Sequence, residues 1–217
     1  MPELSVPLKP RLRGVFHGWA CACSVPLGLA LVVFAGTTSA RIALSIYSVS
    51  LVGLFGVSAL YHRVNWRSLT ARDWMRRLDH SMIFVMIAGS YTPFAVLVLH
   101  GPLAIALLIA VWAGALLGVG FNLAWSDAPT WLRAGLYVIL GWAAVAALPQ
   151  LGAALGIGGM LLLGLGGVLY TVGAVVYALR RPDPAPAVFG YHELFHILVI
   201  AAAALQCAVI AFWILPG

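Results

Sequence analysis

Four ionisable residues stand at the ends of long apolar runs. His62 ends one run, Asp79 begins another, and His192 and His196 lie at the start of the last one. Residues four apart share a helix face, with Cβ atoms about 6 Å apart, so the two histidines of the last run could chelate one ion. Three histidines with an open fourth position form a catalytic zinc arrangement. The sequence therefore predicts Zn²⁺ bound by His62, His192 and His196.

Ser58 and Asp79 carry side chains that suit catalysis beside such an ion. Ser58 precedes His62 by one helical turn on the same face, so its hydroxyl could hydrogen-bond a metal-bound water or a substrate carbonyl. Asp79 could accept a proton from that water, whose pKa zinc lowers to about 7. Plain structural roles are the alternative: a histidine at a helix end can sit among headgroups, and Asp79 can cap a helix. Non-ligand roles are expected for the other histidines, His17, His80 and His100.

The segment from His192 to His196 also matches the pattern His-Glu-x-x-His, in which two histidines bind zinc and the glutamate is the base of a metalloprotease. An intramembrane protease is therefore an alternative. Such enzymes take a third ligand from another acid, often near an Asn-Pro or Asp-Gly element, and the sequence contains neither element. A match of five residues also arises by chance in an apolar helix.

Composition indicates which elements must position these residues. Of 217 residues, 63% are hydrophobic and 8% are charged, and the mean hydropathy is +1.04. Soluble domains are nearer to about 45–50% apolar and roughly a quarter charged. The chain is therefore expected to be an all-α integral membrane protein and not a nucleic-acid binder, in spite of its pI near 9.7. About 20 apolar residues cross a bilayer, and seven such spans are predicted at about 18–36, 43–62, 79–99, 102–122, 132–149, 158–179 and 191–214.

Arginine and lysine set the orientation of the predicted seven-transmembrane-helix bundle, because cytoplasmic loops carry an excess of both. With the N-terminus inside, eleven of these residues lie on the cytoplasmic side and only Arg41 lies outside. The N-terminus is therefore predicted to be cytoplasmic and the C-terminus extracytoplasmic. This orientation places all three predicted zinc ligands and Asp79 at the cytoplasmic end. The 63–77 loop is expected to lie against anionic lipid headgroups.

The predicted spans form a single integral membrane domain, residues 1–217, because no linker is long enough to divide the chain. The first span is expected to be retained, since its apolar run is longer than the roughly 7–15 residues usual in a signal peptide. Pro149 and Gln150 are expected to end the fifth span. Gly114-x-x-x-Gly118 and a series of glycines in the sixth span predict close helix packing, either within the chain or in a homodimer.

Motifs in four of the spans occur in an order that resembles one known family from about residue 15 to the C-terminus. They are Ser58-Ala-Leu-Tyr-His62, Leu78-Asp-His-Ser-Met-Ile-Phe84 running into Ala88-Gly-Ser-Tyr-Thr-Pro-Phe94, the Gly158–Tyr177 region, and His192-Glu-Leu-Phe-His196. They resemble the haemolysin III proteins, the bacterial branch of the progestin and adipoQ receptor family, which includes the adiponectin receptors.

This resemblance implies a seven-helix bundle with a cytoplasmic N-terminus and zinc near the cytoplasmic surface. It places the metal on His62, His192 and His196, with Asp79 and Ser58 beside it. It also implies similarity to alkaline ceramidases and other metal-dependent lipid hydrolases. Gln206 departs from the pattern, because bacterial relatives often carry another histidine there.

The favoured function is a zinc-dependent integral membrane hydrolase that cleaves a lipid amide or ester at the cytoplasmic leaflet. Zinc would polarise the carbonyl, Asp79 would orient the water and pass its proton to the leaving group, and Ser58 would hold the developing oxyanion. Eleven arginines against one lysine suggest a GC-rich genome and hence a bacterial plasma membrane. Two alternatives remain: a non-enzymatic membrane sensor or lipid-homeostasis protein with a structural zinc, and a haemolysin-type pore, for which the spans lack a polar stripe.

Overall fold

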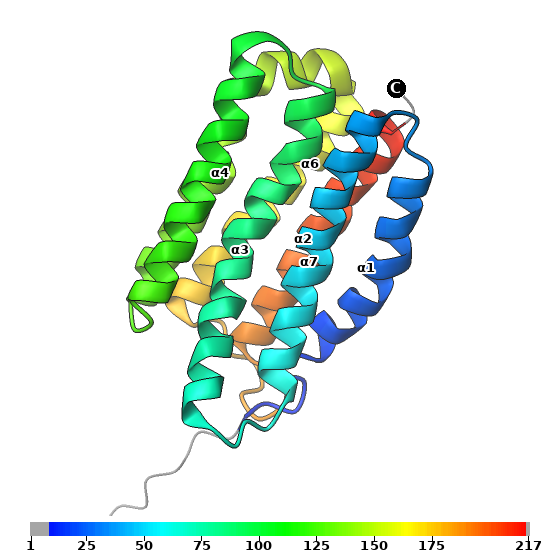
Figure 1. The fold of residues 1–217 in the computed structure, drawn as a ribbon. Helices are drawn as coiled ribbons and strands as arrows, with labels where there is room; N and C mark the ends of the chain where they lie inside the picture. The colour runs from blue at the N-terminus through cyan, green and yellow to red at the C-terminus, as the bar shows by residue number, and fades with distance from the viewer. Residues whose placement is uncertain (1–8, 216–217) are drawn as a thin grey trace, which may run out of the picture.

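The chain folds into a bundle of long helices. The computed structural model describes residues 9–215, in which six helical segments are long and apolar enough to cross a membrane and no strand occurs. The predicted all-α membrane fold is therefore confirmed, whereas the count of seven spans is not. Figure 1 shows the first and the last described residues at opposite ends of the bundle. The elements are α1 Val15–Val33, α2 Thr38–Arg63, α3 Leu69–Leu97, α4 Gly101–Ala124, α5 Thr130–Gly141, η1 Trp142–Ala147, α6 Leu148–Leu179, α7 Tyr191–Val209 and η2 Ile210–Ile214.

Helix α3 begins well before the span predicted for it. Ser68 caps the helix by accepting a hydrogen bond from the Ala71 N–H at 3.3 Å. Asp73 then pairs with Arg76 and Arg77 within the same helix at 2.7 and 2.8 Å. The first turns of α3 are polar and are stabilised by this cap and these ion pairs. Hydropathy therefore detects only the apolar part of the helix. Most of the predicted 63–77 loop is therefore helical, and Asp79 lies inside α3 instead of capping its start.

The segment from α5 to α6 folds back on itself. Thr130, at its start, accepts a hydrogen bond from Arg180 at 3.4 Å, so the two ends of the segment lie together. Gln150, near its middle, contacts His100 at the opposite end of the bundle. Gly156 interrupts α6 with a φ of 60°, a conformation that glycine adopts at little cost.

The sequence predicts that Pro149 ends the fifth span, and the structure places this proline two residues after η1, in the following helix. Helix α5 ends at Gly141 and is followed directly by the 3₁₀ helix η1. Pro149 lies in the first turn of α6. A proline is favoured there because the first turn of a helix needs no N–H donor. The proline therefore marks the start of α6, directly after the α5–η1 segment.

Neighbouring helices approach closely at small residues. Helix α2 packs on α1 and α3, α3 on α4, and α6 on α5 and α7. A Cβ at Gly118 would lie 2.5 Å from the ring of Phe84, and one at Gly114 would lie 2.6 Å from Leu140. The Gly114-x-x-x-Gly118 pattern thus serves helix contacts within this chain.

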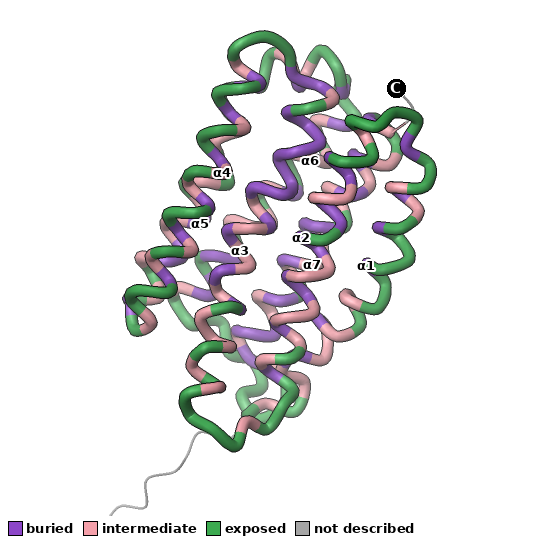
Figure 2. The backbone as a smooth tube through the Cα atoms, in the orientation of Figure 1, coloured by how far each residue is buried: buried purple, intermediate pink, exposed green. Residues whose placement is uncertain are grey.

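Burial separates the inside of the bundle from its outer surface. Buried residues face the interior of the bundle (Figure 2), and they include Tyr47, Leu44 and Val111. Large apolar side chains cover the outside, among them Leu117 at 76% and Ile157 at 82% exposure. An apolar outer surface of this kind matches a lipid environment.

Candidate metal centre

Three histidine side chains converge at one end of the bundle. His62 comes from the last turn of α2, and His192 and His196 come from the first turns of α7. One ring nitrogen from each lies within 4.8 Å of the other two. The Nε2 atoms of His62 and His192 are 3.1 Å apart. Because all three rings are buried, the predicted ligand triad is assembled away from water.

The donor atoms of this cluster suit a tetrahedral metal ion. Zinc bonds to histidine nitrogen at about 2.0–2.1 Å, so two ligand nitrogens on one zinc lie roughly 3.3 Å apart. The separation of 3.1 Å between His62 and His192 is close to this value. His196 Nδ1 is also buried, without a hydrogen-bond partner among residues 9–215. Buried nitrogen lone pairs that converge in this way provide a donor set that zinc favours.

Asp79 and Ser58 lie beside the histidines, as the sequence predicts. The Asp79 Oδ2 atom is 3.7 Å from His62 Nε2. Ser58 lies one turn before His62 on α2, and both side chains are buried. Ser58, Asp79, His192 and His196 all line the same cavity. A carboxylate and a hydroxyl therefore face the space that the histidine cluster borders.

The cavity runs from this cluster into the bundle. Its volume is about 240 Å³, whereas a single buried water needs only roughly 10–15 Å³. Beyond the cluster its walls are mostly apolar side chains of α3, α5, α6 and α7, including Phe94, Leu151, Leu163 and Val199. Such walls suit a hydrocarbon chain whose polar end lies at the histidines.

His17 contacts the cluster, which the sequence analysis did not anticipate. Its ring stacks on that of His196, with centroids 3.7 Å apart and planes 12° apart. Both of its ring nitrogens are buried and have no partner within the described range 9–215. Helix α1 begins at Val15, so His17 lies inside it and not before it. The available signal was its position at the charged end of an apolar run, the feature that singled out the other histidines.

The two remaining histidines differ in their surroundings. His80 lines the cavity, and its Nε2 lies 3.2 Å from the Tyr177 hydroxyl. It is therefore close to the cluster but held by a tyrosine. His100 lies at the opposite end of the bundle, where its backbone N–H donates to Gln150 Oε1 at 2.9 Å. Neither belongs to the three-histidine group.

Glu193, the acid of the His-Glu-x-x-His pattern, is bound by other groups. One carboxylate oxygen pairs with Arg13, and the other accepts a hydrogen bond from the Gly190 N–H at 2.8 Å. The second contact caps the N-terminus of α7. Both oxygens are therefore engaged away from the three histidine nitrogens. This arrangement favours a structural role for Glu193 over the base of a protease.

The chain before α1 packs against the cluster from the charged end. The N–H groups of Arg11 and Leu12 donate to the carbonyls of Ala187 and Val188 at 3.1 and 3.2 Å. Gly14 has a φ of 77°, and a Cβ there would lie 2.6 Å from the His62 Cβ. Residues 10–14 thus tie the start of the chain to the α6–α7 loop and to His62.

Comparison with known proteins finds one family over nearly the whole chain. The family model described as haemolysin-III related matches residues 6–207. Hemolysin-3 of Bacillus cereus is 32% identical over 94% of this chain and 91% of its own length, and the Hemolysin-3 homolog of Bacillus subtilis is 31% identical over 93% and 92%. An adiponectin receptor protein of Drosophila melanogaster is 28% identical over 76% of this chain and 41% of its own length.

Proposed function

The chain belongs to the haemolysin III related family and is a multi-pass bacterial membrane protein, and on that premise we propose that it is a zinc-dependent hydrolase of a lipid amide or ester bond. One observation carries the proposal: three imidazoles converge beside a carboxylate and a hydroxyl, and all of these groups except His62 line one apolar cavity. The polar cluster would hold the bond to be cleaved, and the cavity would hold the acyl chain.

His62, His192 and His196 would hold the metal. When bound by three histidines with an open position, zinc acts as a Lewis acid that polarises a carbonyl and lowers the pKa of water to about 7. His17 would keep the His196 ring in place by stacking on it. The burial of all four rings excludes competing water ligands from the sides of the cluster.

Asp79 and Ser58 would handle the proton and the developing charge. Asp79 would orient the attacking water by accepting its hydrogen bond, take its proton, and deliver that proton to the leaving nitrogen or oxygen. The Ser58 hydroxyl would donate a hydrogen bond to the water or to the carbonyl oxygen as that oxygen becomes negative. Both residues line the cavity beside the histidines, which supports these roles.

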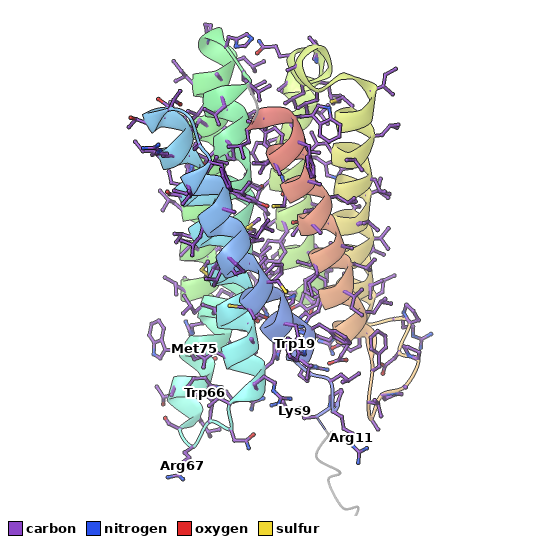
Figure 3. The ribbon with its side chains drawn as sticks, turned by 90° about the vertical axis from the view of Figure 1, so that its right-hand side faces the viewer. Lys9, Arg11, Trp19, Trp66, Arg67 and Met75 are labelled. Atoms are coloured by element: carbon purple, nitrogen blue, oxygen red, sulfur yellow. The ribbon has the colours of Figure 1, made fainter. Side chains whose placement is uncertain are left out.

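The proposed topology is seven crossings with a cytoplasmic N-terminus. Together α5 and η1 rise about 30 Å, which is about the thickness of the hydrocarbon core. The contacts of Thr130 with Arg180 and of Gln150 with His100 support one crossing by α5–η1 and a second by α6. Lys9, Arg11 and Arg67 lie at one end of the bundle (Figure 3), which the positive-inside rule assigns to the cytoplasm. The site then faces the cytoplasmic leaflet.

Anionic lipid headgroups would contact the charged end, at the residues between α2 and α3 and the first turns of α3. Burial, and then the charges of Arg63, Arg13 and Arg72, lower the pKa of Lys9. Positive charge is therefore concentrated beside the cluster. A phosphate headgroup here would neutralise part of this charge and position the substrate.

An Asp79→Asn variant tests the proposed chemistry. The substitution keeps the side-chain shape but removes the proton acceptor, so hydrolysis of N-acyl sphingoid bases and acylglycerols should fall by about 100-fold or more. The zinc content should stay the same, since Asp79 is not among the three ligands. Turnover is measured by mass spectrometry of released fatty acid, with His100→Asn as the matched control. Undiminished hydrolysis by Asp79→Asn would reject the assigned base.

A structural zinc in a non-enzymatic sensor is the second candidate, and one observation favours it. Helix α2 packs chiefly on α1 and α3, and α7 packs chiefly on α6. A metal shared by His62 and the α7 histidines would therefore tie together two helices that pack on different neighbours. Under this candidate, chelation lowers the Tm and none of the tested lipids is hydrolysed.

A further inference from the structure

Helix α7 presents one long face to the cavity, and this face carries a polar group at each end. His192, Val199 and Gln206 are spaced seven residues apart, and all three line the cavity. Residues at that spacing share a helix face. The histidines occupy the charged end of the face, Val199 its middle, and Gln206 the far end. Gln206 plays no part in the metal centre.

The side-chain oxygen of the partly buried Gln206 is unpaired. Its Oε1 atom is buried and has no hydrogen-bond partner among the residues that the structure describes. On α6, Gly166 packs against Ala202 and Leu205, which lie just before Gln206 on α7, and a glycine offers no side chain to pair with it. Buried side-chain oxygens normally have partners, so an unpaired one on a residue that lines a cavity indicates a group supplied from outside the chain.

The distance from the histidine cluster to Gln206 sets the length of a ligand that could contact both. Gln206 follows His196 by ten residues, which is about 15 Å along the helix axis. Tyr170 of α6 lines the cavity as well. Tyr170 follows Gly166 by one helical turn towards the charged end, so its depth in the bundle is between that of the histidines and that of Gln206. An extended hydrocarbon chain covers about 15 Å in roughly twelve carbons, given C–C bonds of about 1.5 Å.

We propose that Gln206 is a second polar subsite, which selects lipids with a hydroxyl group partway along the acyl chain. The hydroxyl would lie roughly twelve carbons from the carbonyl held at the histidines, a spacing set by the helix rise. A hydroxyl both donates and accepts, so it pairs with the amide in either of its two orientations. This inference rests on the proposed function for the position of the carbonyl, and it names the substrate class of that site.

Binding of positional isomers tests the subsite without any turnover. The probes are two hydroxylated octadecanoic acids, one with its hydroxyl roughly twelve carbons from the carboxyl group and one with it beside the carboxyl group. Each displaces a fluorescent fatty acid from the full-length protein in detergent micelles. The mid-chain isomer should bind about 5-fold more tightly, the effect of one added hydrogen bond. Because the isomers have the same composition, partition into detergent affects both alike.

The Gln206→Leu variant should bind the two isomers equally. Gln150→Leu changes the other glutamine, which contacts His100 at the far end of the bundle, and should keep the preference. Gln206→Met, which preserves side-chain length, replaces the leucine variant if the latter does not fold. Equal binding by the unaltered protein, or a preference that persists in both Gln206 variants, would overturn the subsite. A protein that shows the preference but hydrolyses no lipid keeps the subsite and rejects the hydrolase.

Discussion

At the level of single residues, the histidine cluster depends on how its buried imidazole rings contact one another. His196 contacts His17 on one side and His192 and His62 on the others, with ring centroids 3.7, 4.6 and 5.2 Å away. Stacking fixes a ring without using its nitrogens. We therefore expect His17 to act as a positioning residue through the shape of its ring, since neither ring nitrogen has a partner among residues 9–215.

Substitution of His17 separates these two properties. His17→Ala should weaken zinc binding by about 10-fold, which is the lower end of the loss in metal affinity expected when a residue that supports a ligand is removed. His17→Phe keeps a flat ring against His196 and should bind zinc nearly as well as the unaltered protein. Competition with a fluorescent chelator gives both affinities. If the phenylalanine variant were as weak as the alanine variant, the His17 nitrogens would be the important feature and stacking would not.

The sequence could predict three of these histidines because their evidence is local. His192 and His196 share a helix face by spacing alone, and His62 lies at the same predicted depth as they do. His17 could not be assigned in this way, because its stacking on His196 depends on how α1 packs against α7. A contact between the first and last helices leaves no spacing pattern in one sequence.

At the level of elements, helix ends decide where the charged groups lie. Ser68 caps α3, which begins ten residues before the apolar run, and Pro149 lies inside the first turn of α6 instead of in a loop. Caps and first-turn prolines are short signals with more than one structural meaning. Hydropathy therefore locates the apolar part of each helix but not its ends.

Gly14 gives a prediction at this level. Gly14→Ala adds a Cβ that would lie 2.6 Å from the His62 Cβ and also forces a positive φ on alanine. The strained backbone alone should lower the free energy of unfolding by about 1–2 kcal/mol. The clash should also displace His62 and weaken zinc binding. Gly101→Ala is the matched control, because Gly101 has a φ of 67° but open space around it.

Thermal unfolding and zinc affinity are measured for both glycine variants. Both should lower the Tm, whereas only Gly14→Ala should lower zinc affinity. Equal zinc affinities in the two variants would show that the residues before α1 do not support the cluster.

At the level of the whole molecule, charge and chain direction set the side of the membrane that the site faces. The proposed seven crossings place Asp127 and Pro184 in the cytoplasm and Ala153 outside. Cysteines are introduced singly at these positions after replacement of Cys21, Cys23 and Cys207. In intact cells an impermeant maleimide should label Ala153→Cys and leave Asp127→Cys and Pro184→Cys unlabelled until the cells are lysed.

The opposite labelling pattern would invert the proposed orientation. Protection of all three positions, with labelling of His100→Cys as the outside control, would mean that the 130–179 segment does not return through the membrane as proposed. Asp127 is a suitable site because its side chain is 81% exposed.

The zinc content of the purified protein tests the central claim most directly. Inductively coupled plasma mass spectrometry should find one zinc per chain in the unaltered protein and in His100→Ala, the distant histidine control. The double variant His192→Ala, His196→Ala removes two of the three converging nitrogens and should lose the metal. A double variant that retains one zinc per chain would contradict the account.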